Sequence, residues 1–366
     1  MTPEEWSVIL LSLKVSLVAV LLTLPVAFAL AWLLARGRFP GRMLLDALVH
    51  LPLVVPPVVV GWGLLMLFGI RGPIGGPLHD WFGIRLVFTT EGAALATAVM
   101  SFPLIVRAVR LGIESIDPGL EAAARTLGAG PVDRFLTVTL PLMSPGILAG
   151  AVTAFAAGLG EFGAVITFVS NIPGETQTLP LAIYSATQTA GGEGTAARLA
   201  GIAFGTNGPA GRLLADWFGL SFMFRWTGAA LAAAIMALPL MVRAMRLSIE
   251  SVDQRLEGAA RTLGAGPTRT FLSITLPLAM PGVLAGAVLG FARWIGEFGA
   301  TITFVSNIPG ETRTIPIAIY GALQIPGNEA EVTRLAIIAV LLSLGALLVS
   351  ELLTRRMGPG KGGHVL

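Results

Sequence analysis

Residues 161–180 read EFGAVITFVSNIPGETQTLP, and residues 297–316 read EFGATITFVSNIPGETRTIP. The two segments lie 136 residues apart, and the similarity continues on both sides without a gap, with about 60% of the paired positions identical. Solenoid repeats have much shorter periods, of roughly 20–50 residues. The chain therefore contains a duplicated piece of one domain, in which residues 68–203 are repeated as residues 204–339.

The two copies are unequal. We assign residues 1–203 to a first copy with helices 1 to 4 and a fifth helix that is cut short near Arg198. Residues 204–366 form a second copy that lacks helices 1 and 2 and keeps helices 3 to 5. The joining stretch, residues 196–204, is too short to cross a bilayer core of about 30 Å, so both of its flanks are expected on the outer side.

The composition indicates an integral membrane protein. Of 366 residues, 54% are hydrophobic and only 12% are charged, and the mean hydropathy is +0.81. Soluble domains carry about 25% charged residues. The chain has no Cys, which excludes disulfides, thiolate metal sites and cysteine nucleophiles. We expect neither a metal site nor a cofactor.

The apolar pattern predicts an all-α protein with about seven transmembrane helices. They are residues 8–35, 44–69, 92–113, 146–170, 228–249, 282–306 and 335–354. Lys and Arg follow the odd-numbered segments, at Arg36, Arg38 and Arg42, at Arg107, Arg110, Arg125 and Arg134, at Arg243, Arg246, Arg255, Arg261 and Arg269, and at Arg355, Arg356 and Lys361. The positive-inside rule then predicts an outer N-terminus and a cytoplasmic C-terminus.

A short polar loop on the predicted cytoplasmic side occurs in both copies. It reads LEAAARTLGAGP at residues 120–131 and LEGAARTLGAGP at residues 256–267, and VTLP or ITLP follows at residues 138–141 or 274–277. The pattern predicts a short helix with an acidic start and a small-residue face, ended by Gly and Pro. The spacing alone leaves two interpretations: a solvated connection, or a docking element for another protein.

These loops resemble the coupling-loop signature of binding-protein-dependent ABC importer permeases, E-x-A-A-x-x-x-G followed by nine residues and I/V-x-L-P. Four further segments narrow the resemblance to the molybdate (or tungstate) permeases, with the sulfate and thiosulfate permeases as close relatives. These segments are LPLVVPPV at 51–58, FPL at 102–104, GEFG at 160–163 and NIPGETQTLP at 171–180.

The resemblance implies a type I ABC-importer permease fold and a role as the membrane subunit of a molybdate importer in the cell inner membrane. It implies a cytoplasmic ABC ATPase subunit and an extracytoplasmic oxyanion-binding protein as partners. A second permease chain, forming a homodimer, is expected unless the chain is itself a pseudo-dimer. The sequence has no G-x-x-x-x-G-K-[ST] phosphate loop. ATP hydrolysis is therefore expected in a separate subunit, and this chain is not expected to be an enzyme.

Two groups of candidate site residues follow. The resemblance assigns one ATPase contact to Glu121, Ala123, Ala124 and Gly128, and the other to Glu257, Ala259, Ala260 and Gly264. Brief contacts of the anion with backbone and hydroxyl groups are expected at the outer mouth of the pore. The candidates there are Thr167, Ser170 and Asn171 with their copies Thr303, Ser306 and Asn307. The competing interpretation is that these residues cap a helix end.

Glu161 and Glu297 are intramembrane carboxylates by position. Such groups are functional candidates by default, so both are pore or gate candidates. A carboxylate repels a dianion, and we therefore favour a structural role, through hydrogen bonds at a helix end, over a gating role. Arg293 stands four residues before Glu297 and is placed to pair with it, whereas the first copy has Ala157 there.

Three alternatives stay open. In the first, the chain is a permease for sulfate, thiosulfate or tungstate and not for molybdate. A secondary transporter is another, because those proteins also use internal repeats and broken helices. The third is a fused fragment that does not transport, because the second copy lacks two helices and the first copy lacks most of its fifth.

Overall fold

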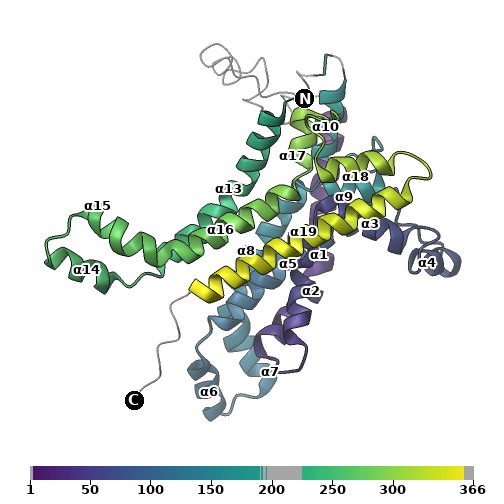
Figure 1. Ribbon diagram of the computed structural model, residues 1–366. Helices are drawn as coiled ribbons and strands as arrows, with labels where there is room; N and C mark the ends of the chain where they lie inside the picture. Colours follow the sequence, from purple (N-terminus) through teal and green to yellow (C-terminus); the bar gives the residue numbers. More distant parts are fainter. Residues whose placement is uncertain (1–2, 190, 193–194, 196–224, 358–366) are drawn as a thin grey trace. The chain divides into compact units, whose positions relative to one another are not determined.

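The computed structural model describes residues 3–189, 191–192, 195 and 225–357, and all regular structure within these residues is helical (Figure 1). The contacts divide the chain into a first unit, Met1–Leu53 with Pro57–Ala210, and a second unit, Gly211–Leu366 with Val54–Pro56. The predicted junction of the copies at residues 203 and 204, and the truncated fifth helix near Arg198, lie outside the described residues. Each unit is described by itself below.

The first unit consists of long apolar helices joined by short ones. In chain order they are α1 (Pro3–Arg36), α2 (Arg42–Val54), α3 (Pro57–Phe68), α4 (Gly75–Phe82), α5 (Thr90–Glu114), α6 (Pro118–Thr126), α7 (Pro131–Arg134), the π-helix η1 (Phe135–Thr139), α8 (Leu140–Leu159), α9 (Gly163–Val169) and α10 (Leu179–Gln188).

The second unit repeats this order from α5 onward. Its elements are α13 (Trp226–Glu250), α14 (Gln254–Thr262), α15 (Pro267–Thr270), the π-helix η2 (Phe271–Thr275), α16 (Leu276–Ile295), α17 (Gly299–Val305), α18 (Ile315–Leu323) and α19 (Glu329–Met357). The elements from α13 to α17 have the same bounds as α5 to α9, shifted by the 136 residues of the sequence repeat. The duplication is thus a duplication of structure.

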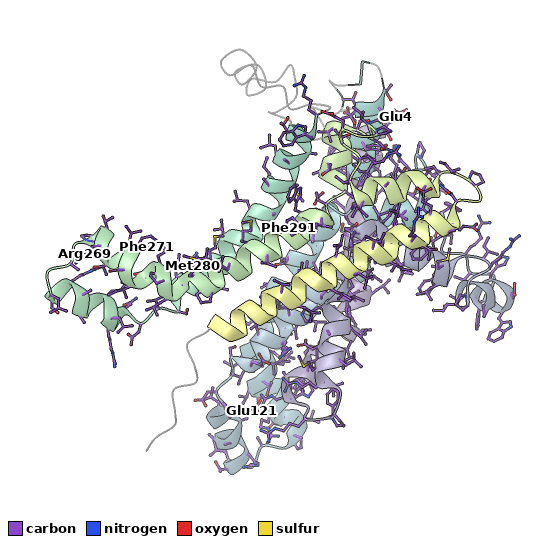
Figure 2. All side chains as sticks on the ribbon, in the orientation of Figure 1. Glu4, Glu121, Arg269, Phe271, Met280 and Phe291 are labelled. Carbon is purple, nitrogen blue, oxygen red and sulfur yellow. The ribbon has the colours of Figure 1, made fainter. Side chains whose placement is uncertain are left out.

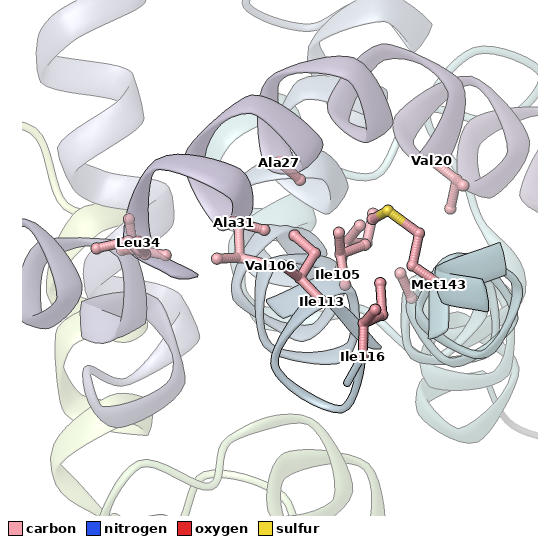
Figure 3. Close-up of a cluster of buried hydrophobic side chains, with 12 residues drawn as sticks. Val20, Ala27, Ala31, Leu34, Ile105, Val106, Ile113, Ile116 and Met143 are labelled. Carbon is pink, nitrogen blue, oxygen red and sulfur yellow. The ribbon is translucent and has the colours of Figure 1, made fainter. Parts of the chain in front are cut away.

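Helix α1 packs on α5 and α8 and supplies one side of the core of the first unit. Figure 3 shows Ala27 and Ala31 of α1 beside Val106 and Ile113 of α5, and all four side chains are buried. Small residues let membrane helices approach closely. The second unit has no element that corresponds to α1 among its described residues.

Four helices are long and apolar enough to cross a membrane among the described residues: Pro3–Arg36, Thr90–Glu114, Pro131–Leu159 and Pro267–Ile295. The pair α2–α3 makes a fifth if it is one span. The two remaining predicted spans correspond to α13, whose apolar part Trp226–Leu238 is shorter, and to α19.

Two predicted helices are broken rather than continuous. Residues 44–69 form α2 and α3, which meet at an angle of 114°, because Pro56 and Pro57 lack the amide hydrogens that a continuous helix needs. Residues 146–170 form the end of α8 and then α9, with a break at residues 160–162. The same break recurs between α16 and α17. The short helices α9 and α17 are thereby separate elements at the ends of their spans.

The approach of α3 to α9 depends on Gly61. A Cβ atom at Gly61 would lie 2.7 Å from the Ala164 carbonyl oxygen and 2.8 Å from Thr167 Cβ. Gly63, two residues later on the same helix, has nothing within 4 Å of such an atom. The glycine at position 61 therefore permits a helix contact that any side chain would push apart.

We predict that Gly61→Ala lowers the free energy of unfolding by about 1–3 kcal/mol, because the extra methyl group overpacks the α3–α9 contact. Gly63→Ala is the matched control and is expected to leave stability unchanged or slightly higher, because alanine favours the helix. Thermal melting of the two detergent-purified variants measures the difference. Equal melting temperatures would show that α3 and α9 do not pack this closely at Gly61.

Candidate functional sites

The two predicted docking loops form short helices with the same caps. Asp117 begins α6 and its carboxylate accepts a hydrogen bond from the Gly119 amide at 2.8 Å. In the second unit Asp253 does the same for the Arg255 amide at 2.9 Å at the start of α14. Aspartate is a preferred N-cap, and glycine with a positive φ commonly follows a helix end. Gly128 and Gly264 fill that last role, with φ of 89° and 84°.

Glu121 points back onto its own unit. Its Oε1 atom accepts hydrogen bonds from Arg36 Nη2 at 2.6 Å and from Thr139 Oγ1 at 3.0 Å. Arg36 is the last residue of α1, and Thr139 ends η1. The resemblance assigned this carboxylate to an ATPase contact. The structure instead gives it an internal role, which fixes α6 against the end of α1.

Aromatic rings strengthen the same junction. Phe135, the first residue of η1, packs edge-on against Trp32 at 5.5 Å and against Phe28 at 6.2 Å between ring centroids. The Arg36 guanidinium lies 5.7 Å from the centroid of the Trp32 ring, within the range of a cation–π interaction. Helix α1 thus holds the first loop through one ion pair and one aromatic cluster.

The second loop has less support. Glu257 Oε1 accepts a hydrogen bond from Thr275 Oγ1 at 2.6 Å, as Glu121 does from Thr139. Within the described residues, no cation lies within ion-pair distance of Glu257. Phe271, which corresponds to Phe135, is 43% exposed on the arm that α15, η2 and α16 form (Figure 2). In the first loop these contacts come from α1, and no helix among the described residues of the second unit corresponds to α1.

Both loops present an apolar side chain that sequence reasoning missed. Leu127 and Leu263 are each 88% exposed at the C-terminal ends of α6 and α14. Ala123 and Ala259 are exposed beside them, and Ala124 and Ala260 are half-buried. Exposed apolar groups gathered at one place mark interaction sites. The signal was present in the repeated letters T-L-G, because a leucine before a helix-ending glycine has no core to enter.

The intramembrane glutamates close the helix breaks. Glu161 Oε1 accepts a hydrogen bond from the Ala164 amide at 2.9 Å, and Glu297 Oε1 accepts one from the Ala300 amide at 3.0 Å. Each carboxylate thereby satisfies an amide in the first turn of α9 or α17, where helices leave such groups free. Glu297 is 5% exposed, and Arg293 Nη1 lies 3.4 Å from its Oε2 atom. This geometry supports the structural role that we favoured for both residues and gives the pairing expected for Arg293.

The outer loops that follow α9 and α17 begin with a strained residue. Ser170 has φ 64° and ψ −164°, and Ser306 has φ 63° and ψ −167°, a region that is essentially restricted to glycine. Thr176 Oγ1 donates to the Ser170 carbonyl at 3.1 Å and accepts from the Ile172 amide at 2.9 Å. Thr312 makes both corresponding bonds at 3.0 Å. A buried threonine thus holds the strained turn in each copy.

The remaining outer candidates are not gathered into one polar cluster. Thr167 Oγ1 donates to the Gly163 carbonyl of its own helix at 2.7 Å, and Thr303 lies half-buried on α17. Asn171 Nδ2 donates to Ser185 Oγ at 2.6 Å. Asn307 Oδ1 instead accepts from Arg313 Nε at 2.9 Å. The two outer loops therefore share a backbone shape and differ in charge, because Gln177 stands where the second copy has Arg313.

Comparison with known protein families identifies a family that matches this chain in two places. The sequence profile of the family described as "Binding-protein-dependent transport system inner membrane component" matches residues 24–215 and again residues 199–359. The two matches together extend over most of the chain and reproduce the duplication.

Named relatives agree with this assignment. The "Molybdenum transport system permease protein ModB" of Escherichia coli K12 is 62% identical over 199 residues, which cover 54% of this chain and 87% of that protein. The protein of the same name from Haemophilus influenzae is 56% identical over 195 residues, 53% of this chain and 85% of its own length. The "Sulfate transport system permease protein CysT" of Salmonella typhimurium is 44% identical over 155 residues, 42% of this chain and 56% of that protein. The chain therefore belongs to the binding-protein-dependent transport system inner membrane components, as an all-α, multi-pass membrane protein with the type I importer permease fold.

Proposed function

We propose that this chain is the membrane-spanning permease subunit of an ATP-driven importer that moves molybdate into the cytoplasm. The observation that carries the proposal is the E-x-A-A-x-x-x-G helix, which occurs in both units with the same caps and the same exposed leucine. A separate ABC ATPase subunit would dock there. An extracytoplasmic oxyanion-binding protein would deliver the anion from the other side.

Molybdate is the substrate that the relatives favour. The molybdenum permeases of Escherichia coli and Haemophilus influenzae match longer segments at higher identity than the sulfate permease of Salmonella typhimurium. Sulfate, thiosulfate and tungstate are the alternatives, since all are oxyanions of the same shape and charge class. Import of a dianion against an interior-negative potential costs about 2.3 kcal/mol per charge for each 100 mV. This requirement fits a transporter that is coupled to ATP hydrolysis.

For ATPase docking, we propose Glu121, Ala123, Ala124 and Gly128 in the first loop and Glu257, Ala259, Ala260 and Gly264 in the second. The contacts divide these residues into two roles. The glutamates and glycines set the position and the end of each helix. The alanines and the adjacent leucines supply the surface that a partner groove would cover, because apolar groups that lose water on docking dominate such contacts.

For the outer mouth, we propose brief anion contacts with the turns at Ser170 and Ser306 and with their neighbours Thr167, Asn171, Thr303 and Asn307. Glu161 and Glu297 are assigned to capping the first turns of α9 and α17 and not to binding the anion. Their carboxylates already accept amide hydrogens, and like charges at close range repel strongly in a low dielectric.

A fused fragment that does not transport is a second candidate, and one observation favours it. The second unit lacks a counterpart of α1 among its described residues. Phe271 is exposed, and Glu257 has a hydrogen bond from Thr275 but no ion pair among these residues. Rescue of molybdate-dependent growth in a permease-deleted strain decides between the two candidates. Restored growth supports the importer over the fragment, and molybdate uptake that persists after ATP depletion would favour a secondary transporter instead.

The subunit stoichiometry of the complex with its co-expressed ATPase, measured by native mass spectrometry, tests the partner proposal. Two ATPases per single chain would mean that both loops dock and that the chain is a pseudo-dimer. Two ATPases per two chains would mean a homodimer in which half of the loops are idle. No bound ATPase would leave the family membership intact and reject the proposed docking.

We predict that Leu127→Asp lowers retention of the ATPase by about tenfold, which corresponds to 1.4 kcal/mol, because a charge replaces an apolar group at the docking surface. Leu263→Asp tests the second loop in the same way. Affinity capture of the ATPase with each purified variant gives the readout.

Val132→Thr is the matched control for these variants. Val132 is also highly exposed, at 70%, but the second copy has Thr268 at the corresponding position, so a polar group is compatible with the loop. Retention in this variant is expected to equal that of the wild type. If both aspartate variants retain the ATPase as well as Val132→Thr does, the leucines are not docking residues.

A further inference from the structure

Helix α1 contacts the two candidate sites of the first unit at its opposite ends. At one end, Arg36 donates to Glu121 on the docking helix α6. Toward the other end, Ser12 Oγ accepts a hydrogen bond from the amide of Leu179 at 2.6 Å. Leu179 is the first residue of α10 and directly follows the outer loop. Figure 2 shows Glu4 near the start of α1 and Glu121 at opposite ends of this unit.

The Ser12 contact satisfies a specific need of α10. The first amides of a helix have no partner within the helix, and a Thr side chain at the N-cap normally accepts from one of them. Thr178 occupies the N-cap of α10 but makes no capping hydrogen bond, and its hydroxyl has no partner among the described residues. Ser12, which is 2% exposed, accepts from α10 in its place. Its hydroxyl also donates to the Val8 carbonyl at 2.8 Å, so both of its hydrogen-bonding functions are used.

The body of α1 between these contacts is firmly packed. Ser12 and Arg36 are 24 positions apart on one helix, which corresponds to about 36 Å at 1.5 Å per residue. The side chains that face α5 and α8 along this length are fully or almost fully buried: Val15, Ala19, Ala27, Ala31 and Leu34. Close-packed interiors transmit displacement instead of absorbing it. A shift of the docking helix would therefore reach the outer loop through α1.

We propose that α1 is the strut that couples the first docking helix to the outer loop at residues 170–179, with Arg36 and Ser12 as its positioning residues. The second unit lacks this connection in its described part, because no helix there corresponds to α1. Among the described residues the two docking loops are therefore unequal, and we expect docking at α6, but not at α14, to move an outer loop through α1. This inference rests on the proposed function, since it assigns a mechanical path to the ATPase contact.

The absence of Cys from the chain permits a direct test with single spin labels. One variant carries Glu175→Cys in the outer loop of the first unit, and its matched control carries Glu311→Cys at the corresponding position of the second. Both side chains are exposed. The full-length chain is purified with its ATPase, and the change in label mobility on addition of ATP is measured by electron paramagnetic resonance. We expect a clear change at position 175 and little or no change at position 311.

Variants of the strut are then introduced beside the label at position 175. Ser12→Ala and Arg36→Gln are each expected to remove most of the mobility change, because each loses one of the hydrogen bonds by which α1 holds the docking helix or the outer loop. Arg36→Lys keeps the positive charge and is expected to restore most of the response. Ser7→Ala is the matched control for Ser12, since Ser7 lies on the same helix and its hydroxyl bonds only the nearby Glu4 carbonyl.

ATPase retention and molybdate uptake are measured in the same preparations, which separates failure of this inference from failure of the proposed function. Retention and uptake without a change at position 175, or with equal changes at positions 175 and 311, would overturn the strut. An unaltered response in both Ser12→Ala and Arg36→Gln would overturn it as well. No retention of the ATPase by the wild type would reject the proposed function, and the strut with it.

Discussion

The absence of water in the bilayer core sets the constraint on which this structure depends. Every backbone amide and carbonyl there must find its partner inside the protein, yet the spans of this chain are interrupted at Pro56 and near residues 160 and 296. Polar side chains fill the gaps. Glu161 and Glu297 receive amides of α9 and α17, and Ser12 receives the first amide of α10. Several of the polar side chains that bond backbone amides thus stand where helices begin or are broken.

Duplication without the first helix makes the two units chemically different. The short elements repeat with identical bounds, because their caps and glycines are encoded locally and travel with the copied segment. The ion pair of Glu121 with Arg36 was not copied, because Arg36 belongs to α1. Local structure therefore survives the duplication, whereas among the described residues the ion pair that ties the short helix to α1 is found in the first unit alone.

The sequence predicted what is encoded locally and missed what depends on distant partners. The E-x-A-A-x-x-x-G spacing located α6 and α14, and the position of Arg293 predicted its contact with Glu297. The breaks after Leu159 and Ile295 were not predicted, because apolar residues resume directly after Glu161 and Glu297 and the predicted spans continued across them. The Arg36–Glu121 pair joins residues 85 positions apart, and no periodic pattern reveals such a pairing in a single sequence.

The π-helices η1 and η2 have a consequence for how this protein can change over time. Each π-helix holds one residue more than an α-helix of the same rise, directly before a long transmembrane helix. Deleting that residue would turn the helix that follows by about 100° about its axis, and the lipid-facing side would then face the helix packed against it. Substitution is tolerated at such a place, but a change of length is not. The two copies, which differ at about 40% of their positions, accordingly keep both π-helices at the same place and at the same length.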